Sequence, residues 1–430
     1  MSKPLKVAIA GLGTVGVGTL SLLRQQADLI TQRAGRPITV TAVSSRDRAK
    51  ERGVSLSGLH WYDDAATMAA EADVDVVVEV IGGANGTGRA TCEAALKHGR
   101  HLVTANKALL AEIGADLARA AEAKGLALGF EASVGGGIPI VKAIREGLAG
   151  NRLSQVTGIL NGTCNYILTQ MRESKREFAE VLAEAQSLGY AETDPSFDID
   201  GVDSAHKLAI LASLAFGTKV DFNKVHVEGI RHVSALDIRF ADELGYRIKL
   251  LGIARRTAAG IEQRVHPCMV PVQSSIGGVE GVFNAVAIEG DFVGRAMFEG
   301  RGAGAGPTAS AVAADLIDIA AGRIGPSFGI KADQLKPLRA VPMSEYRGSY
   351  YIRLMVLDRH GVFADIAAAL RDEEVSMEAV LQHGRAPGET VPVVMTVHST
   401  KEAAMMRALE RIARLDAVVE TPRLIRIENF

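Results

Sequence analysis

Five carboxylates stand close together near the middle of the chain, at Glu192, Asp194, Asp198, Asp200 and Asp203. Lys207 follows Asp203 by four residues and opens the apolar run LAILASLAFG. Acidic residues suit a helix N-terminus, where free backbone N–H groups and the helix dipole favour negative charge. A cap needs only one or two acids, and capping leaves Lys207 unexplained. Because residues four apart share a helix face, Asp203 and Lys207 are predicted neighbours. The alternative is a lysine whose stem lies along the apolar helix while its amine reaches water.

A glycine loop near the N-terminus has the spacing of a dinucleotide-binding turn, G-x-G-x-x-G. It lies between a predicted strand, 5–10, and a helical pattern that covers 19–30. The first glycine permits the tight turn, the second lets backbone approach a pyrophosphate, and the third lets helix pack on strand. The helix N-terminus then offers N–H groups to the phosphates. The predicted cofactor-binding residues are Gly11, Leu12, Gly13, Thr14, Val15 and Gly16.

The end of the next predicted strand, 38–45, indicates which dinucleotide binds. An enzyme that uses NAD usually has Asp or Glu there for the ribose hydroxyls. Here Ser44, Ser45 and Arg46 stand at that place, and a guanidinium beside hydroxyls suits a 2′-phosphate. NADP(H) is therefore favoured, although Asp47 follows directly and an exposed basic turn is the alternative. NAD(H) remains open.

The elements around these residues predict an α/β protein of several parts. Apolar strands alternate with amphipathic helices to about residue 130, which is typical of a Rossmann-like, doubly wound parallel sheet. Residues 131–322 predict an α+β catalytic and dimerisation domain that ends in a glycine loop and a helix, about 307–322, belonging to the first domain. The predicted helices of this domain are 139–148, 162–172, 176–188 and 202–216, and its predicted strands are 153–161, 225–233, 246–255 and 261–271.

The C-terminal part predicts a small separate module. Residues 323–347 contain three prolines and little periodicity, and they are interpreted as a linker. Residues 348–430 predict the order βαββαβ, a ferredoxin-like arrangement, with a turn at 384–389 between its second and third strands.

Composition narrows the class of protein. The chain has 430 residues, 47% of them hydrophobic, and a net charge of −2, which gives no electrostatic grip on nucleic acid or a lipid surface. The three cysteines are scattered and unpaired in pattern, as in reduced cytoplasmic proteins. We expect a cytoplasmic enzyme with a small-molecule substrate, and neither nucleic acid nor membrane as a partner.

Several motifs together resemble the homoserine dehydrogenase family, in its monofunctional bacterial form with a C-terminal ACT domain. They are GLGTVGVG, VVVEVIGG, VTANKALLA, EASVGGGIPI, ILNGTCNYI, LGYAETDPSFDIDGVDSAHKLAILA and GAGPTASAV, in order over about 1–320. The resemblance implies reversible reduction of L-aspartate 4-semialdehyde to L-homoserine with NAD(P)H, in threonine, methionine and isoleucine biosynthesis.

The resemblance also implies roles for the charged residues. Glu192 and Asp203 would hold the ammonium group of the amino-acid substrate, with Asp198 close by. Lys207 would be the acid/base residue, and Lys107 would lie between nicotinamide and substrate. Burial or the second cation is expected to lower the pKa of Lys207. From the residues alone, Lys107 is equally a solvated lysine in a first helical turn.

Two further sites follow from the resemblance. A monovalent cation, Na⁺ or K⁺, would be held by backbone carbonyls of Glu131, Val134, Gly136 and Ile138, where a purely structural glycine turn is the alternative. Gly304 would lie against the cofactor, although close packing of the following helix explains this loop equally well.

The resemblance to an ACT domain implies a regulatory ligand, with threonine expected, at paired modules of a homodimer or homotetramer. The predicted ligand-facing residues are Asp358, Gly361, Val362 and Gln382. His360 stands where proline commonly precedes the glycine, which loosens the loop. The alternative is a dimerisation module that has lost its ligand.

Two competing classes make different demands on the sequence. Dehydrogenases that form a thioester need a nucleophilic cysteine, and Cys164 in NGTCNYI has the most suggestive setting. A redox-sensing regulator would usually carry a helix-turn-helix and a basic face, and neither is evident in the sequence.

Overall fold

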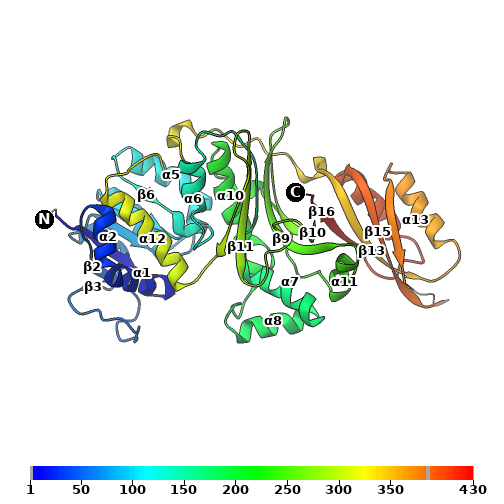
Figure 1. Cartoon of the computed structure of the whole chain (residues 1–430), viewed down its shortest axis with the longest axis horizontal. Coiled ribbons are helices and arrows are strands. Elements are labelled where there is room, and N and C mark those ends of the chain that lie inside the picture. Colours follow the sequence, from blue (N-terminus) through cyan, green and yellow to red (C-terminus); the bar gives the residue numbers. More distant parts are fainter. Residues whose placement is uncertain (1–2, 384–387, 430) are drawn as a thin grey trace.

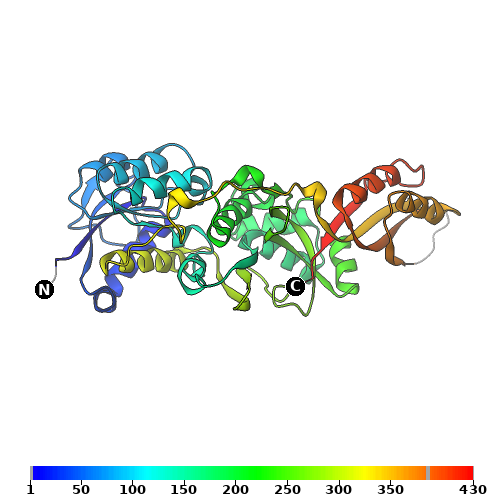
Figure 2. The same cartoon turned by 90° about the horizontal axis from the view of Figure 1, so that it is seen from above.

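The computed structural model describes residues 3–383 and 388–429, which form three parts in a row (Figures 1 and 2). The N-terminal part holds one sheet, and a second sheet runs through the middle and C-terminal parts. Most of the turn expected at 384–389 lies outside the described residues. Among the residues that are described, no helix is both long and apolar enough to cross a membrane.

The first sheet is parallel throughout, with the strand order β3-β2-β1-β4-β5-β6. Its strands are β1 (Leu5–Ala10), β2 (Ile38–Ser44), β3 (His60–Tyr62), β4 (Val76–Glu79), β5 (His101–Thr104) and β6 (Leu128–Gly129). The chain reverses its winding direction between β1 and β4. At such a switch point the carboxyl ends of the strands open a crevice in which ligands bind. The predicted Rossmann-like fold is confirmed.

Helices cover both faces of this sheet because its strands are apolar on both sides. Val7 and Ile9 pack in one cluster with side chains of α1 (Thr14–Gln25), α2 (Ala27–Ala34) and α12 (Ala305–Ala320). Ala8 and Ala10 pack on the opposite face, among the helices α3 (Ala65–Glu71), α4 (Thr87–Lys97) and α5 (Lys107–Glu122). Helix α12 therefore returns to the first domain from almost 300 residues further along the chain.

The middle part is an antiparallel sheet with helices on it, in the order β12-β11-β7-β9-β10. Its strands are β7 (Leu153–Ile159), β9 (Tyr246–Arg256), β10 (Ile261–Pro271), β11 (Phe283–Gly290) and β12 (Gly294–Arg301). Its helices are α6 (Ile140–Lys142), α7 (Gly162–Ser174), α8 (Phe178–Ser187), α9 (Ser196–Ile199), α10 (Val202–Phe216) and α11 (Ala235–Glu243).

The structure differs from the sequence-based expectations for this part in three respects. The strand predicted over 225–233 is only β8 (His226–Val227), because the chain then turns away from the sheet and Ile230 N–H donates to Ile199 C=O at 2.8 Å. The helix predicted over 139–148 is the short α6 followed by a π-helical turn, Ala143–Gly147. Helix α11 and strands β11 and β12 were not predicted from the sequence.

The C-terminal part has the order β13 (Arg347–Leu357), α13 (Val362–Arg371), β14 (Met377–Gln382), β15 (Thr390–Lys401), α14 (Glu402–Ile412) and β16 (Arg423–Ile427). Its strands lie in the order β16-β13-β15-β14 with antiparallel neighbours, as in a ferredoxin-like fold. This order agrees with the βαββαβ pattern expected from the sequence.

The C-terminal part is joined to the middle part by its own last strand, and not only by the segment 323–347. β16 pairs in parallel with β10, through Cys268 with Arg426 and Met269 with Ile427, so one sheet runs through both parts. The connecting segment is also fixed, since Lys336 exchanges backbone hydrogen bonds with residues 217 and 219. Figure 1 shows the C-terminus back beside the middle sheet.

Candidate active site

Two lysines from different parts of the chain share one buried carboxylate. Lys107 is the first residue of α5, directly after β5, and its Nζ lies 2.9 Å from Asp203 Oδ1. Lys207 Nζ donates to Asp203 Oδ2 at 2.7 Å and to the carbonyl of Leu160 at 2.7 Å. Asp203 is 3% exposed and Lys207 is 8% exposed, whereas a third of the Lys107 side chain is exposed. The structure thus brings together three residues that the sequence analysis selected.

The local sequence explains why helices α5 and α10 both begin beside this carboxylate. Asn106 caps α5, since its Oδ1 accepts the Leu109 N–H at 3.1 Å, and its amide nitrogen donates to Gly83 C=O at 2.8 Å beyond β4. Gly201, with φ +85°, starts α10 in the left-handed region that favours glycine. Asp203 then falls in the first turn of α10, where the helix dipole favours an acid, and Lys207 falls one turn later.

Asn161 completes the cluster, although the sequence analysis gave it no role. Its amide nitrogen donates to Asp198 Oδ1 at 2.8 Å and to Asp203 Oδ2 at 2.9 Å. Its Oδ1 accepts the Cys164 N–H at 2.8 Å and so caps α7. An Asn directly before a predicted helix is a recognised N-cap signal, and that signal would have singled it out.

The charges in this cluster shift one another. Burial alone would raise the pKa of Asp203, but the ammonium groups of Lys207 and Lys107 hold it well below its usual range. Burial lowers the pKa of Lys107, yet the charge of Asp203, helped by Asp198 and Glu192, outweighs it, and the pKa ends above its ordinary value. The Asp203 carboxylate lies between the two amines, at 2.9 Å from Lys107 Nζ and 2.7 Å from Lys207 Nζ.

The other acids of the opening cluster divide into two groups. The pKa of Asp198 is raised by burial and by the nearby Asp203, although the Asn161 hydrogen bond opposes this. Glu192 is exposed, and it acts on Lys107 only through its charge. Asp194 accepts the Ser196 N–H at 3.1 Å as a turn residue, and Asp200 pairs with Arg231. Asp198 and Glu192 therefore act on Lys107 through their charge, whereas Asp194 and Asp200 make local contacts within a turn and with Arg231.

Cys164 lies beside this cluster, but its state does not suit a nucleophile. Its thiol is buried and donates to the Asp198 carbonyl at 3.3 Å. Burial, together with the negative charge of Asp198, raises the pKa of the thiol well above its ordinary value. A thioester mechanism needs the thiolate, so the geometry disfavours that class.

The glycine loop has the shape that a pyrophosphate requires. Gly11 has φ +101°, and a side chain at Gly16 would meet the Gly11 carbonyl at 1.9 Å, so both positions need glycine. An added Cβ at Gly13 would meet nothing within 4 Å, so the turn is open there. Thr14 and Val15 begin α1, and no side chain caps the N–H groups of its first turn. A cavity of about 690 Å³ lies over the turn and the N-terminal end of α12, which follows Gly304.

Arg52 is a basic side chain held at this cavity, and it was not selected from the sequence. Its Nε donates to the Leu12 carbonyl at 3.4 Å, and its Nη2 donates to Ser45 Oγ at 3.2 Å. Its guanidinium also lies 5.7 Å from the ring centre of Trp61. Arg46 is exposed on the same loop. Arg52 is therefore held against the nucleotide turn, whereas Arg46 projects into solvent.

The turn proposed for a monovalent cation uses backbone atoms. No group of three or more His, Cys, Asp or Glu that suits a metal occurs in the described part of the chain. Gly136, with φ +48°, packs so closely on Gly302 that a Cβ would meet its carbonyl at 2.5 Å. The Glu131 side chain instead accepts the Val141 and Lys142 N–H groups at 3.0 and 2.8 Å. The backbone carbonyls of Glu131, Val134, Gly136 and Ile138, which are expected to hold a monovalent cation, belong to this segment, and the Ile138 carbonyl already accepts the Ile140 N–H at 2.7 Å.

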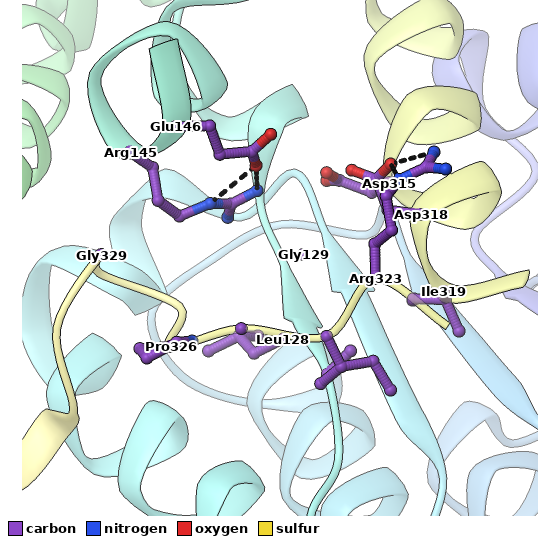
Figure 3. A pocket seen from close by; sticks show the side chains of 13 residues that line it. Leu128, Gly129, Arg145, Glu146, Asp315, Asp318, Ile319, Arg323, Pro326 and Gly329 are labelled. Carbon is purple, nitrogen blue, oxygen red and sulfur yellow. Dashed lines mark hydrogen bonds and ion pairs between the residues drawn. The ribbon is translucent and has the colours of Figure 1, made fainter. Parts of the chain in front are cut away.

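Another cavity, of about 350 Å³, is lined by residues of β6, of α12 and of the segment after α12 (Figure 3), and neither Lys107 nor Lys207 lines it. Its charges are already paired: Arg145 with Glu146, and Arg323 with Asp318. Asp315 accepts the Glu131 N–H at 2.9 Å, and burial raises the pKa of Asp315 to about 6. The internal pairing indicates a structural junction, and we do not assign the active site to it.

The residues predicted to bind a regulatory ligand lie at one end of the C-terminal part. Gly361, with φ +91°, precedes α13, and Val362 is its buried first residue. Asp358 C=O accepts the Gly388 N–H at 3.0 Å, and Gln382 ends β14. The glycine leaves an open approach to the helix N-terminus, since an added Cβ would meet nothing within 4 Å.

Comparison with known proteins decides the family. Residues 139–317 match the family described as Homoserine dehydrogenase, and residues 11–131 match Homoserine dehydrogenase, NAD binding domain. Homoserine dehydrogenase of Neisseria gonorrhoeae is 45% identical, over 100% of this chain and 99% of that one. The chain belongs to the homoserine dehydrogenase family. It is thus an NAD(P)-dependent oxidoreductase of amino-acid biosynthesis, and a match over both full lengths supports the monofunctional bacterial form.

Solved structures of the homoserine dehydrogenase family agree with the fold. A homoserine dehydrogenase from Thiobacillus denitrificans has a TM-score of 0.94 and 45% identity, and the match covers 99% of each chain. A hyperthermophilic archaeal homoserine dehydrogenase in complex with NADPH has a TM-score of 0.65 and 24% identity, over 75% of this chain and 99% of that one. The second likeness concerns the fold alone.

Proposed function

We propose that the enzyme reduces L-aspartate 4-semialdehyde reversibly to L-homoserine, with NADP(H) preferred and NAD(H) accepted less well. The observation that carries this proposal is the pair Lys107 and Lys207 on the Asp203 carboxylate, at the carboxyl edge of the parallel sheet. An aldehyde oxygen between two ammonium groups is polarised, and one of them can supply the proton that the product alcohol needs.

We assign the steps as follows. When bound, the nicotinamide would supply the hydride that the aldehyde carbon accepts. Lys207 gives its proton to the developing alkoxide and takes it back in the reverse direction, while Lys107 orients the oxygen. Asp203 holds both amines in place, and Glu192 and Asp198 are the acids left for the substrate ammonium, which can also share Asp203.

The cofactor and cation assignments rest on the loops. We propose that Gly11 to Gly16 bind the pyrophosphate, that Gly304 lies against the cofactor, and that Arg52 with Arg46 binds the 2′-phosphate. The proposed Na⁺ or K⁺ would bind the carbonyls of 131, 134, 136 and 138. Such an ion would fix this turn against the loop that precedes α12, which Gly136 already contacts.

The test is an assay with separate cofactors. Purified enzyme is mixed with aspartate semialdehyde and either NADPH or NADH, and the loss of nicotinamide absorbance is followed. We expect turnover with both, and a higher kcat/KM with NADPH. Absence of turnover with either cofactor would refute the proposed reaction, and equal kcat/KM values would refute only the preference.

The C-terminal part, 348–430, is proposed to be an ACT domain that binds threonine, in a homodimeric or homotetrameric, cytoplasmic enzyme. The other proposed domains are 1–130 with the helix about 307–322, 131–322, and the connection 323–347. Three buried cysteines without disulfide bonds support the cytoplasmic location, and the open loop at Gly361 supports a ligand site in the C-terminal part.

Gly361→Ala tests the regulatory site without removing β16. A residue with φ +91° disfavours any side chain, so the loop should change. We expect threonine to inhibit the intact enzyme and to inhibit this variant less, with kcat unchanged. Gly125→Ala, another open glycine with φ +64°, is the matched control. If both variants are inhibited like the wild type, threonine acts at the active site as a substrate mimic.

A further inference from the structure

A buried arginine on the last strand reaches out of the C-terminal part. Arg426 of β16 is 3% exposed, and its Nη1 and Nη2 donate to Glu228 Oε2 and Oε1 at 2.8 and 2.9 Å. Its Nε donates to Glu402 Oε2 at 3.0 Å, so one guanidinium bridges α14 of the C-terminal part and a loop of the middle part. Such bidentate pairs fix geometry as well as charge.

Glu228 belongs to a loop that underlies the acidic cluster. Its own N–H donates to the Val265 carbonyl of β10 at 2.7 Å, and two residues later Ile230 N–H donates to Ile199 C=O at 2.8 Å. Between them, Gly229 packs so tightly that a Cβ would meet the Ile199 carbonyl at 2.2 Å and Asp200 Cα at 2.5 Å. The backbone that follows Glu228 is therefore in direct contact with residues 199–200.

Ile199 and Asp200 lead directly into the substrate side of the active site. Asp198, the residue before Ile199, shares the Asn161 amide with Asp203. Gly201, the residue after Asp200, begins α10 and packs on Val227 and Val265, 3.1 and 3.2 Å from an added Cβ. The loop that contains Glu228 thus packs against the segment that carries Asp198 and against the start of the helical turn that carries Asp203.

We propose that Arg426 and Glu228 form a positioning pair. Through this pair the C-terminal part fixes the position of residues 198–203, called the acidic loop from here on, which carry Asp198 and Asp203 toward the amino-acid substrate. The inference rests on the proposed function and adds to it a physical connection between β16 and the substrate acids. Neither residue touches the reacting groups. Loss of this pair should raise the KM for the amino acid. Cofactor binding should stay unchanged, because the nucleotide loop belongs to the other sheet.

A second buried arginine at the same junction provides the matched control. Arg353 Nε and Nη2 donate to Asp237 Oδ1 and Oδ2 at 2.7 and 3.2 Å, again from the C-terminal part to the middle part. Asp237 lies in α11, whose neighbour Ile238 lines a small cavity with Leu168 and Thr169 on the far half of α7. That pair holds the same junction and has no hydrogen bond to the acidic loop.

The experiment compares Arg426→Lys with Arg353→Lys in the full-length enzyme. Each change keeps the charge and removes the bidentate geometry. For both variants and the wild type, kcat and KM are measured with homoserine and with NADP⁺, and the melting temperature is recorded. We expect Arg426→Lys to raise the homoserine KM about three- to thirtyfold, the range for residues that couple distant sites, with the NADP⁺ KM within about twofold of wild type. Arg353→Lys should lower the melting temperature and leave both KM values unchanged.

Glu228→Gln provides a second route if Arg426→Lys does not fold, although it also disturbs His226, whose Nε2 lies 2.7 Å from Glu228 Oε1. It should raise the homoserine KM in the same way, and the double variant should be no worse than the worse single one. Equal effects of Arg426→Lys and Arg353→Lys on the homoserine KM, or parallel changes in both KM values, would overturn the inference. Absence of homoserine turnover by the wild type would instead overturn the proposed function.

Discussion

Two clusters of buried charge in this molecule use different cations, and the difference matches what each cluster does. At the active site, Lys107 and Lys207 meet on Asp203. At the junction with the C-terminal part, Arg426 meets Glu228 and Glu402. A lysine amine can lose its proton at accessible cost, whereas a guanidinium stays charged and presents a rigid fork of donors. The first cluster is suited to moving a proton and the second to fixing a shape.

Exposure supports this distinction. The Lys107 side chain is one-third exposed, so solvent reaches the lysine cluster at Lys107. Arg426 is enclosed by two strands and a helix, and only the Glu228 end of its pairs reaches solvent. The cation of the first cluster is partly open to solvent at Lys107, whereas Arg426, the cation of the second, is enclosed by protein.

The sharpest test exchanges the cation types. Lys207→Arg keeps the charge but replaces the amine with a guanidinium that does not readily release its proton, so turnover should fall at least about a hundredfold, as for loss of a positioned proton-transfer group. The turnover of Lys107→Ala should fall by a similar factor, because the aldehyde oxygen loses the second ammonium group that polarises it. The measurement is kcat at saturating NADPH, with circular dichroism as the check on folding. Near-normal turnover of Lys207→Arg would contradict the assignment of proton transfer to Lys207.

The second test concerns the carboxylate. Asp203→Asn removes the partner of both lysines, and Glu192→Gln removes one charge near Lys107, so both should raise the KM for the amino-acid substrate, Asp203→Asn the more. Asp194→Asn and Asp200→Asn are controls, since these acids serve a turn and an exposed ion pair. A large effect at Asp194 together with none at Asp203 would reverse this ranking.

A smaller effect is expected at the nucleotide loop. Arg52→Gln and Arg46→Gln should both weaken NADPH more than NADH, because only NADPH carries the 2′-phosphate. The loss at Arg52 should be the larger, since its side chain is already held at Ser45. The KM values for both cofactors decide the matter. Equal losses with NADPH and NADH would show that neither arginine binds the phosphate.

The smallest effect concerns acid stability, in which both clusters should contribute. The pKa values of Asp203 and Glu228 are depressed by their cations, although burial opposes the shift in each case. Depressed carboxyl groups stabilise the fold above their unfolded pKa values, about 4, and this contribution is lost as the pH falls below them. Urea unfolding between pH 6 and about 3 should therefore show a weaker acid dependence in Asp203→Asn and in Glu228→Gln than in the wild type. An unchanged dependence in both variants would exclude these two groups as the source.

Some features could be predicted because they depend on neighbours in sequence. The glycine spacing at 11–16, the apolar runs of the parallel sheet and the four-residue step from Asp203 to Lys207 are all local. The hairpin β11–β12 and the helix α11 were missed, since their residues carry weaker periodicity, and packing decides their form. Asn161 was visible as a cap, but its contact with two acids 37 and 42 residues away was not.

The sequence by itself determined the types of side chain available for chemistry, the winding of the first domain and the helix that carries Asp203 and Lys207. Only the tertiary structure decided that Lys107 meets the same carboxylate, that Arg52 and not Arg46 lies on the nucleotide turn, and that β16 joins β10. The physical reason is the range of the interactions. Helix faces and turns follow from dihedral preferences over a few residues. Ion pairs and parallel strand pairing depend on which distant segments pack together, and burial then fixes the charge of each group.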